Sequence, residues 1–273
     1  MEQLSILFVG DVVGAVGRAS FASAIEELRH ELQPDVVVVN AENSADSGQG
    51  VSAADAEELL AAGADALTTG NHAFDGDGAI ELLEGEMPVL RPHNFHPYLP
   101  GRGHLLLERG GTLVGVLNLA CADLRRVAKS PLFAVEEALR ALAGAGAQTT
   151  LIDIHGAWPA EKRALAHAVD GRACAVLGTH THVPTADAQV LAGGTAVISD
   201  VGMTGASDSL IGFDHFEFIE NLVNGGAEPN AASDNTGVLM GAFVMAQGQR
   251  AESISRVERR VQIHQSDSTA ASR

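Results

Sequence analysis

Short apolar runs rich in valine, isoleucine and leucine alternate along the chain with runs that carry apolar residues at helical spacing. Ile6–Val9 and Val36–Val39 are continuous apolar runs, which are typical of strands covered on both faces. Between them, Arg18–Leu32 carries apolar residues, among them Phe21 and Ile25, at the spacing of one helix face. This alternation predicts an α/β fold.

The alternation continues to the carboxyl end of the chain. Ser52 and Asp55 form a capping pattern that predicts the start of a helix, and Gly63 predicts its end. Further strands are predicted at 66–69, 113–119, 150–154, 175–177 and 197–199, closing strands at 237–246 and 251–260, and helices at 53–62, 78–84, 134–143 and 160–168. The segment 91–103, rich in proline and histidine, is predicted to be a loop.

No stretch with the composition of a linker divides the chain, so we expect one domain over residues 1–265. The small, polar tail at 266–273 is predicted to be disordered. A length of 273 residues and a hydrophobic fraction of 46% are sufficient for one large core.

The formal net charge of −18 argues against partners that are long polyanions. We therefore expect no stable nucleic-acid binding and no membrane association; the formation of a homo-oligomer stays open. The amino-terminal segment lacks the basic region of a signal peptide.

Cys121 and Cys174 lie in apolar runs and form no CxxC pair, which is typical of a reducing compartment. Together these features predict a cytoplasmic protein.

Polar side chains able to bind a metal or a phosphate follow five of the predicted strands. They are Asp11, Glu42 and Asn43, Asn71 and His72, His155, and His180 and His182. Because ligands bind beyond the carboxyl ends of the strands in open α/β sheets, we expect these side chains to converge. Each has a commoner explanation alone, such as a helix cap for Asp11 or a structural histidine for His155. Their coincidence at five strand ends favours a site.

The residue types indicate which metal the site would bind. His180 and His182 are two residues apart, so on an extended chain their imidazoles would point to the same side. Imidazole, carboxylate and amide groups without sulfur suit Mn, Fe, Zn, Co or Ni better than Ca. The set is large enough for two ions if one carboxylate bridges them, and Glu42 is the candidate. Two-metal centres of this kind clamp phosphoryl groups during hydrolysis.

The motifs GDVVG, NAEN, GNHAFD, GTHTH and SDVGMTG occur in this order, with the strand that ends in His155 between the third and the fourth. This ordered set resembles the YmdB-like branch of the calcineurin-type metallophosphoesterases over nearly the whole chain. The resemblance implies a β-sandwich flanked by helices, in four layers α/β/β/α, with two transition-metal ions, Fe or Mn, at the strand ends. It also implies a phosphodiesterase that converts 2′,3′-cyclic nucleotides to 3′-nucleotides by attack of a hydroxide bridging the ions.

The resemblance also assigns roles to individual residues. It places Asp11, Glu42 and His182 on one ion with Asn43 close by, and Glu42, Asn71, His155 and His180 on the other. His72 would be the catalytic residue, acting as general acid beside the phosphate. The chain departs from many members at Ala157, where a glutamate is common.

Two residues of the predicted loop are candidates for substrate binding. Arg91 can grip a phosphate and Asn94 can contact a sugar or a base edge, and for both the alternative is a structural role in the loop. Other functions also stay open for the whole chain: a phosphomonoesterase, or a metal-binding regulatory protein with incidental hydrolysis. An amidohydrolase is disfavoured, because its HxH pair usually follows the first strand.

Overall fold

The computed structural model describes residues 3–226 and 229–263, which contain six helices and two β-sheets. The helices are α1 (Gly14–Leu32), α2 (Ala53–Ala62), α3 (Ala79–Glu84), α4 (Pro131–Gly144), α5 (Pro159–Ala168) and α6 (His215–Asn224). The strands are β1 (Gln3–Val9), β2 (Asp11–Val12), β3 (Val36–Asn40), β4 (Ala66–Thr68), β5 (His104–Arg109), β6 (Thr112–Ala120), β7 (Thr149–His155), β8 (Ala175–Thr179), β9 (Gln189–Val190), β10 (Ala196–Ile198), β11 (Met203–Ala206), β12 (Thr236–Gln247) and β13 (Arg250–Gln262).

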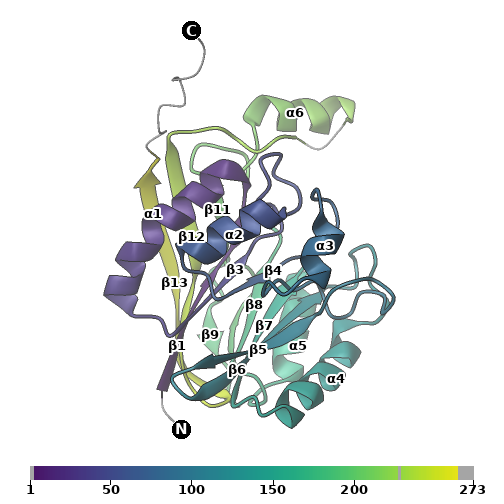
Figure 1. Ribbon diagram of the computed structural model, residues 1–273, viewed down its shortest axis with the longest axis vertical. Coiled ribbons are helices and arrows are strands. Elements are labelled where there is room, and N and C mark those ends of the chain that lie inside the picture. Colours follow the sequence, from purple (N-terminus) through teal and green to yellow (C-terminus); the bar gives the residue numbers. More distant parts are fainter. Residues whose placement is uncertain (1–2, 227–228, 264–273) are drawn as a thin grey trace.

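The two sheets face each other and the helices lie outside them (Figure 1). The first sheet has the order β2-β11-β12-β1-β3-β4, with β13 paired to β12, and the second has the order β5-β6-β7-β8-β10-β9. In Figure 1, α1 and α2 lie against the first sheet, and α4 and α5 against the second. This arrangement confirms the predicted four-layer α/β/β/α fold in a single domain.

Strand β1 shows how the apolar runs build both cores. Successive side chains of a strand point to opposite faces. Leu7 packs in the cluster that contains Phe21 of α1, whereas Ile6 packs in the cluster that contains Val116 of the second sheet. A third cluster joins α4 and α5 to the outer face of the second sheet. The continuous apolar run is needed because β1 is covered on both sides.

Most predicted elements are present with shifted ends, and α2 has the predicted bounds. Its capping box joins Ser52 and Asp55, and Gly63 is its C-cap. Strands β2, β5, β9 and β11 were not predicted, because they are very short or lack a clear period-two pattern. The predicted tail at 266–273 lies outside the described residues. In the part of the chain that the structure describes, no helix has the length and apolarity needed to cross a membrane.

Parallel strands bring the predicted site to one place. β1, β3 and β4 are parallel neighbours in the first sheet, and β6, β7 and β8 are parallel neighbours in the second. The carboxyl ends of the two groups meet, since Glu42 follows β3 and contacts His155 at the end of β7. The site therefore lies between the sheets at a shared edge.

Candidate metal centre

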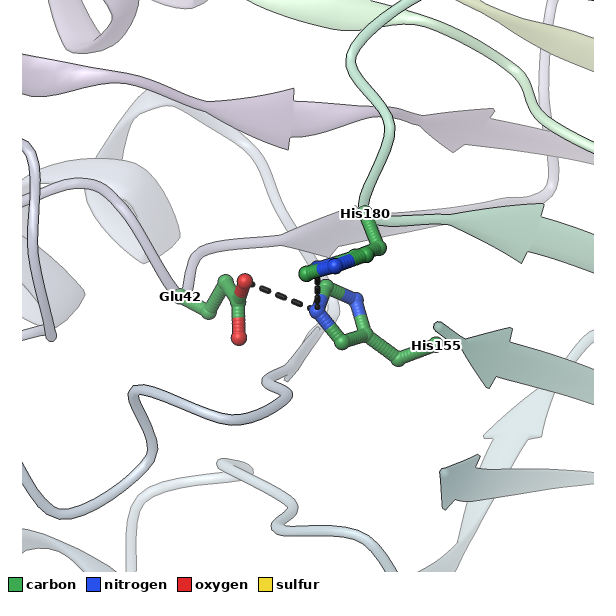
Figure 2. Close-up of side chains that lie close together, drawn as sticks. All are labelled: Glu42, His155 and His180. Carbon is green, nitrogen blue, oxygen red and sulfur yellow. Dashed lines mark hydrogen bonds and ion pairs between the residues drawn. The ribbon is translucent and has the colours of Figure 1, made fainter. Parts of the chain in front are cut away.

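The centre of the site is formed by Glu42, His155 and His180, whose ligand atoms all lie within 4.8 Å of one another. Nε2 of His155 is 2.8 Å from Oε1 of Glu42 and 3.0 Å from Nδ1 of His180. Figure 2 shows the three side chains converging from the loop after β3, the end of β7 and the turn after β8. A carboxylate and two imidazoles at this spacing suit a transition-metal ion.

A chain of hydrogen bonds sets which nitrogen of His155 faces the site. The Thr179 hydroxyl donates to Oδ1 of Asp153 over 2.7 Å, so it accepts from Nδ1 of His155, which lies 2.9 Å away. When the ring is neutral, the lone pair of Nε2 is then directed at the site, as a metal ligand requires. Oδ1 of Asn71 lies 3.1 Å from the same Nε2. The structure thus brings together the four residues predicted for one ion: Glu42, Asn71, His155 and His180.

Two buried oxygen atoms at the site have no hydrogen-bond partner among the described residues. They are Oδ1 of Asp11 and Oδ1 of Asn43. Their other side-chain atoms are engaged: Oδ2 of Asp11 accepts from the His180 amide over 3.1 Å, and Nδ2 of Asn43 donates to the Gly48 carbonyl over 2.7 Å. Buried oxygens without partners are costly, and a bound cation would satisfy them. Both observations fit the predicted ligand roles.

His182 is oriented by its own backbone contact. Its Nδ1 donates to the Ile211 carbonyl over 2.6 Å, which leaves Nε2 as the available ligand atom. The expectation that His180 and His182 face one side of an extended strand is wrong. β8 ends at Thr179, and the two histidines have φ angles of 101° and 63°, in the left-handed region. A tight turn, rather than strand alternation, brings both into the same cavity.

His72 is placed beside the Glu42 carboxylate. Its amide donates to Oε2 of Glu42 over 3.3 Å, and its Nδ1 lies 2.9 Å from Oδ2 of Asp75. Arg126 donates to the Asn71 carbonyl over 2.9 Å and pairs with Asp75. Asp75 and Arg126 therefore hold the segment that carries Asn71 and His72. We had not singled out either residue, although Asp75 stands in the GNHAFD motif.

Without bound ions, the site is a network of opposed charges. Burial favours the neutral form of Glu42, but His155, with smaller contributions from His72 and His180, outweighs this and lowers the pKa of Glu42 to about 2. Burial likewise opposes the charge on His155, yet Glu42 and Asp11 raise its pKa to about 9. Burial raises the pKa of Asp11, against the attraction of His182 and His155. The imidazolium of His155 occupies the electrostatic role that a cation would take.

Comparison with known proteins decides the family. The YmdB-like protein family matches residues 7–257. The chain belongs to this family. A 2′,3′-cyclic-nucleotide 2′-phosphodiesterase of Bacillus subtilis (strain 168) is 37% identical over 219 residues, which cover 80% of this chain and 82% of that protein.

Two solved structures resemble the YmdB-like chain over most of its length. A hypothetical protein from Thermus thermophilus has a TM-score of 0.85 and 35% identity, covering 94% of this chain and 99% of that one. A novel phosphatase from Mycoplasma pneumoniae has a TM-score of 0.86 and 28% identity, covering 96% and 95%. Family, fold and the residues at the strand ends identify the chain as an enzyme of the metallophosphoesterase type.

Gly70 shows how tightly this YmdB-like site is packed. A Cβ atom at this position would lie 2.1 Å from Cδ2 of His155 and 2.2 Å from Oε2 of Glu42. The glycine of the GNHAFD segment is therefore required so that the backbone can approach the ligands closely. Gly70 stands at the start of the GNHAFD motif, and nothing in the sequence pattern predicts this contact.

A cavity of about 440 Å³ opens beside the ligands and has the size of a small-molecule site. Its lining comprises Glu42, Asn43, His72, Ala157, His180, Thr181, His182, Ile211, Phe213, Phe218 and Pro229. Ala157, which stands where many similar proteins have a glutamate, therefore lies on the cavity wall. Asp11 and His155 are fully buried behind it.

Arg91 and Asn94 are not in the lining of this cavity. The buried Arg91 guanidinium donates to the carbonyls of Pro92, Leu99 and Pro100. The Asn94 amide donates to the Ala120 carbonyl and accepts from its amide nitrogen. Both side chains therefore hold the loop together. They line a separate cavity of about 340 Å³, and their contact with a substrate stays a prediction.

Proposed function

We propose that the chain is a dinuclear, metal-dependent phosphodiesterase that hydrolyses 2′,3′-cyclic nucleotides to 3′-nucleotides, with Fe or Mn as its metals. The observation that carries the proposal is the convergence of Glu42, Asn71, His155 and His180. Buried oxygens of Asp11 and Asn43 that accept no hydrogen bond lie beside them. The name of the Bacillus subtilis relative supports the substrate and the bond that is cut.

The chain's own residues would hold two ions as two groups that share Glu42. Asp11, Asn43 and His182 would hold one ion, and Asn71, His155 and His180 would hold the other. When bound, the two ions activate a water molecule as nucleophile and neutralise charge on the phosphoryl oxygens. This local positive charge admits a small anion to a protein whose net charge is −18, since the distant surface charge is screened beyond about 8 Å.

His72 acts as the general acid in this proposal. Attack on phosphorus breaks the bond to the 2′-oxygen, and that oxygen needs a proton as it leaves. The contact between Nδ1 of His72 and Asp75 orients the ring, so the proton is delivered from Nε2. The product keeps its phosphate on the 3′-oxygen.

The proposal is tested by metal content and turnover measured together. Protein loaded with Mn or Fe(II) should hydrolyse 2′,3′-cyclic AMP, lose activity with a chelator and regain it on reloading. Glu42→Gln should lose metal and activity together, because it removes the charge shared by the two groups. Turnover that is unaffected by chelation, or full metal occupancy in Glu42→Gln, would contradict the two-metal proposal.

A phosphomonoesterase is the second candidate, and the naming of the Mycoplasma pneumoniae structure as a phosphatase favours it. Assays of the metal-loaded protein with both substrates distinguish the two activities. Faster turnover of 3′-AMP than of 2′,3′-cyclic AMP would favour a phosphomonoesterase and would not affect the proposal of a metal centre.

A further inference from the structure

The cavity beside the metal centre has two chemically different ends. The lining includes the polar residues Glu42 and Asn43 with three histidines, and the apolar residues Ile211, Phe213, Phe218 and Pro229. Ring contacts run from His182 to Phe213 and on to Phe218, so the aromatic residues extend away from the histidines and form a second end. The second group has no hydrogen-bonding atom in any side chain. Apolar lining contributes most of the exposed wall, which suits an apolar group next to a charged one.

The aromatic end is fixed relative to the metal ligands. The Ile211 carbonyl accepts from His182, and the Phe213 ring stacks on the His182 imidazole with centroids 5.9 Å apart and planes 14° apart. Gly212 has a φ of 97°, and a Cβ there would lie within 3 Å of Val13. The segment from Ile211 to Phe213 therefore cannot move away without disturbing His182.

Phe218 extends this wall from helix α6. Its ring centroid lies 6.2 Å from that of Phe213, with the two planes tilted by 39°. α6 stands at the edge of the molecule in Figure 1, and Phe216 on the same helix is 84% exposed. Phe218, in contrast, lines the cavity and is half-buried. The helix thus delivers one aromatic ring to the site.

We propose that Phe218, together with Phe213, is the stacking surface for the nucleobase of the substrate. The inference rests on the proposed function: the phosphate occupies the metal end, and the base attached to the same ribose lies against the aromatic end. An aromatic ring can stack with every base, because each base has a π-face. With no side-chain donor or acceptor at this end, the enzyme takes nucleoside cyclic phosphates of any base and favours purines for their larger stacking area.

The test compares 2′,3′-cyclic AMP with a base-free methyl riboside 2′,3′-cyclic phosphate. For Phe218→Ala we expect KM for cyclic AMP to rise about tenfold, with kcat within about twofold, because one stacking contact is lost. Turnover of the base-free substrate should not change, which shows that the variant is folded. Phe218→Tyr keeps an aromatic ring and should leave the KM for cyclic AMP unchanged. The matched control Phe216→Ala should have the same KM and kcat as the unaltered protein.

Binding separates this inference from the proposed function. Calorimetry should show 3′-AMP binding to the loaded protein at least roughly tenfold more tightly than ribose 3-phosphate, and Phe218→Ala should remove that difference. Equal affinities for the two ligands, or equal KM changes for both substrates in Phe218→Ala, would overturn the stacking surface. If neither cyclic phosphate is turned over, the proposed function fails, and the two affinities still decide whether the base is bound here.

Discussion

Nζ of Lys162 lies 3.3 Å from Oδ2 of Asp200, and both side chains are almost completely buried. Nζ also donates to the Thr179 carbonyl over 2.7 Å, and the same Asp200 oxygen accepts from the Thr181 amide over 3.0 Å. The pair therefore holds the backbone on both sides of His180. The left-handed conformation of that histidine is unfavourable alone and persists because these contacts determine it.

Replacement of Lys162 by methionine should therefore loosen the proposed metal centre without changing any of its proposed ligands. Breaking a buried ion pair from one side costs about 3–5 kcal/mol of unfolding free energy. The chain's other lysine, Lys129, pairs with Glu137 at the surface, where both side chains are more than 60% exposed. Urea unfolding and metal analysis should show large losses for Lys162→Met and at most about 1 kcal/mol for Lys129→Met. Similar unfolding curves for Lys162→Met and Lys129→Met would contradict a stabilising role of the ion pair between Lys162 and Asp200.

Gly70→Ala should empty the site although alanine is the smallest possible addition. The new methyl group would overlap His155 and Glu42, so one ligand must move. We expect a loss of bound metal and of turnover, read by elemental analysis and activity. Gly144→Ala is the matched control, because its added Cβ would meet no atom within 4 Å beyond its chain neighbours and the backbone of its own helix. It should keep metal, with stability unchanged or raised by up to about 1 kcal/mol. Full occupancy in Gly70→Ala would show that the ligands have room to shift.

His72→Ala should separate catalysis from metal binding. If His72 is the general acid, kcat should fall about 10²- to 10⁴-fold while most of the metal is retained. For a substrate whose leaving group needs no proton, such as a nitrophenyl diester, kcat should fall much less. Loss of both ions in this variant would instead identify His72 as a structural part of the centre.

The convergence of the site residues was predictable from sequence, because parallel apolar strands place the residues that follow them at one edge of the sheet. The two-sheet arrangement was implied only by the family resemblance, since β1 has the same apolar pattern whether it faces a helix or another sheet. The turn at His180 and His182 was not predictable, because its left-handed conformation depends on the distant Lys162 and Asp200. The stacking of Phe213 on His182 likewise joins segments whose contact no spacing reveals.

Asp187 should make stability depend on pH in the acid range. Burial opposes its charge, but hydrogen bonds from Ser199 and Thr185, together with Arg163, lower the pKa of this carboxyl well below its usual range. A lowered folded-state pKa gives stability that is present above about pH 4, the unfolded value, and is lost as pH falls further. Asp187→Asn should therefore be less stable than the unaltered protein at pH 7, and the difference should narrow at pH 3. Urea unfolding of metal-free protein checks this, and a difference that widens on acidification would contradict it.

The central claim is that the loaded centre cuts the bond to the 2′-oxygen of a cyclic nucleotide. Chromatography of the products formed from 2′,3′-cyclic AMP by Mn- or Fe(II)-loaded protein tests it most directly. We expect 3′-AMP as the product, and no product after removal of the metal. Formation of 2′-AMP, or no product from protein shown to hold two ions per chain, would contradict it.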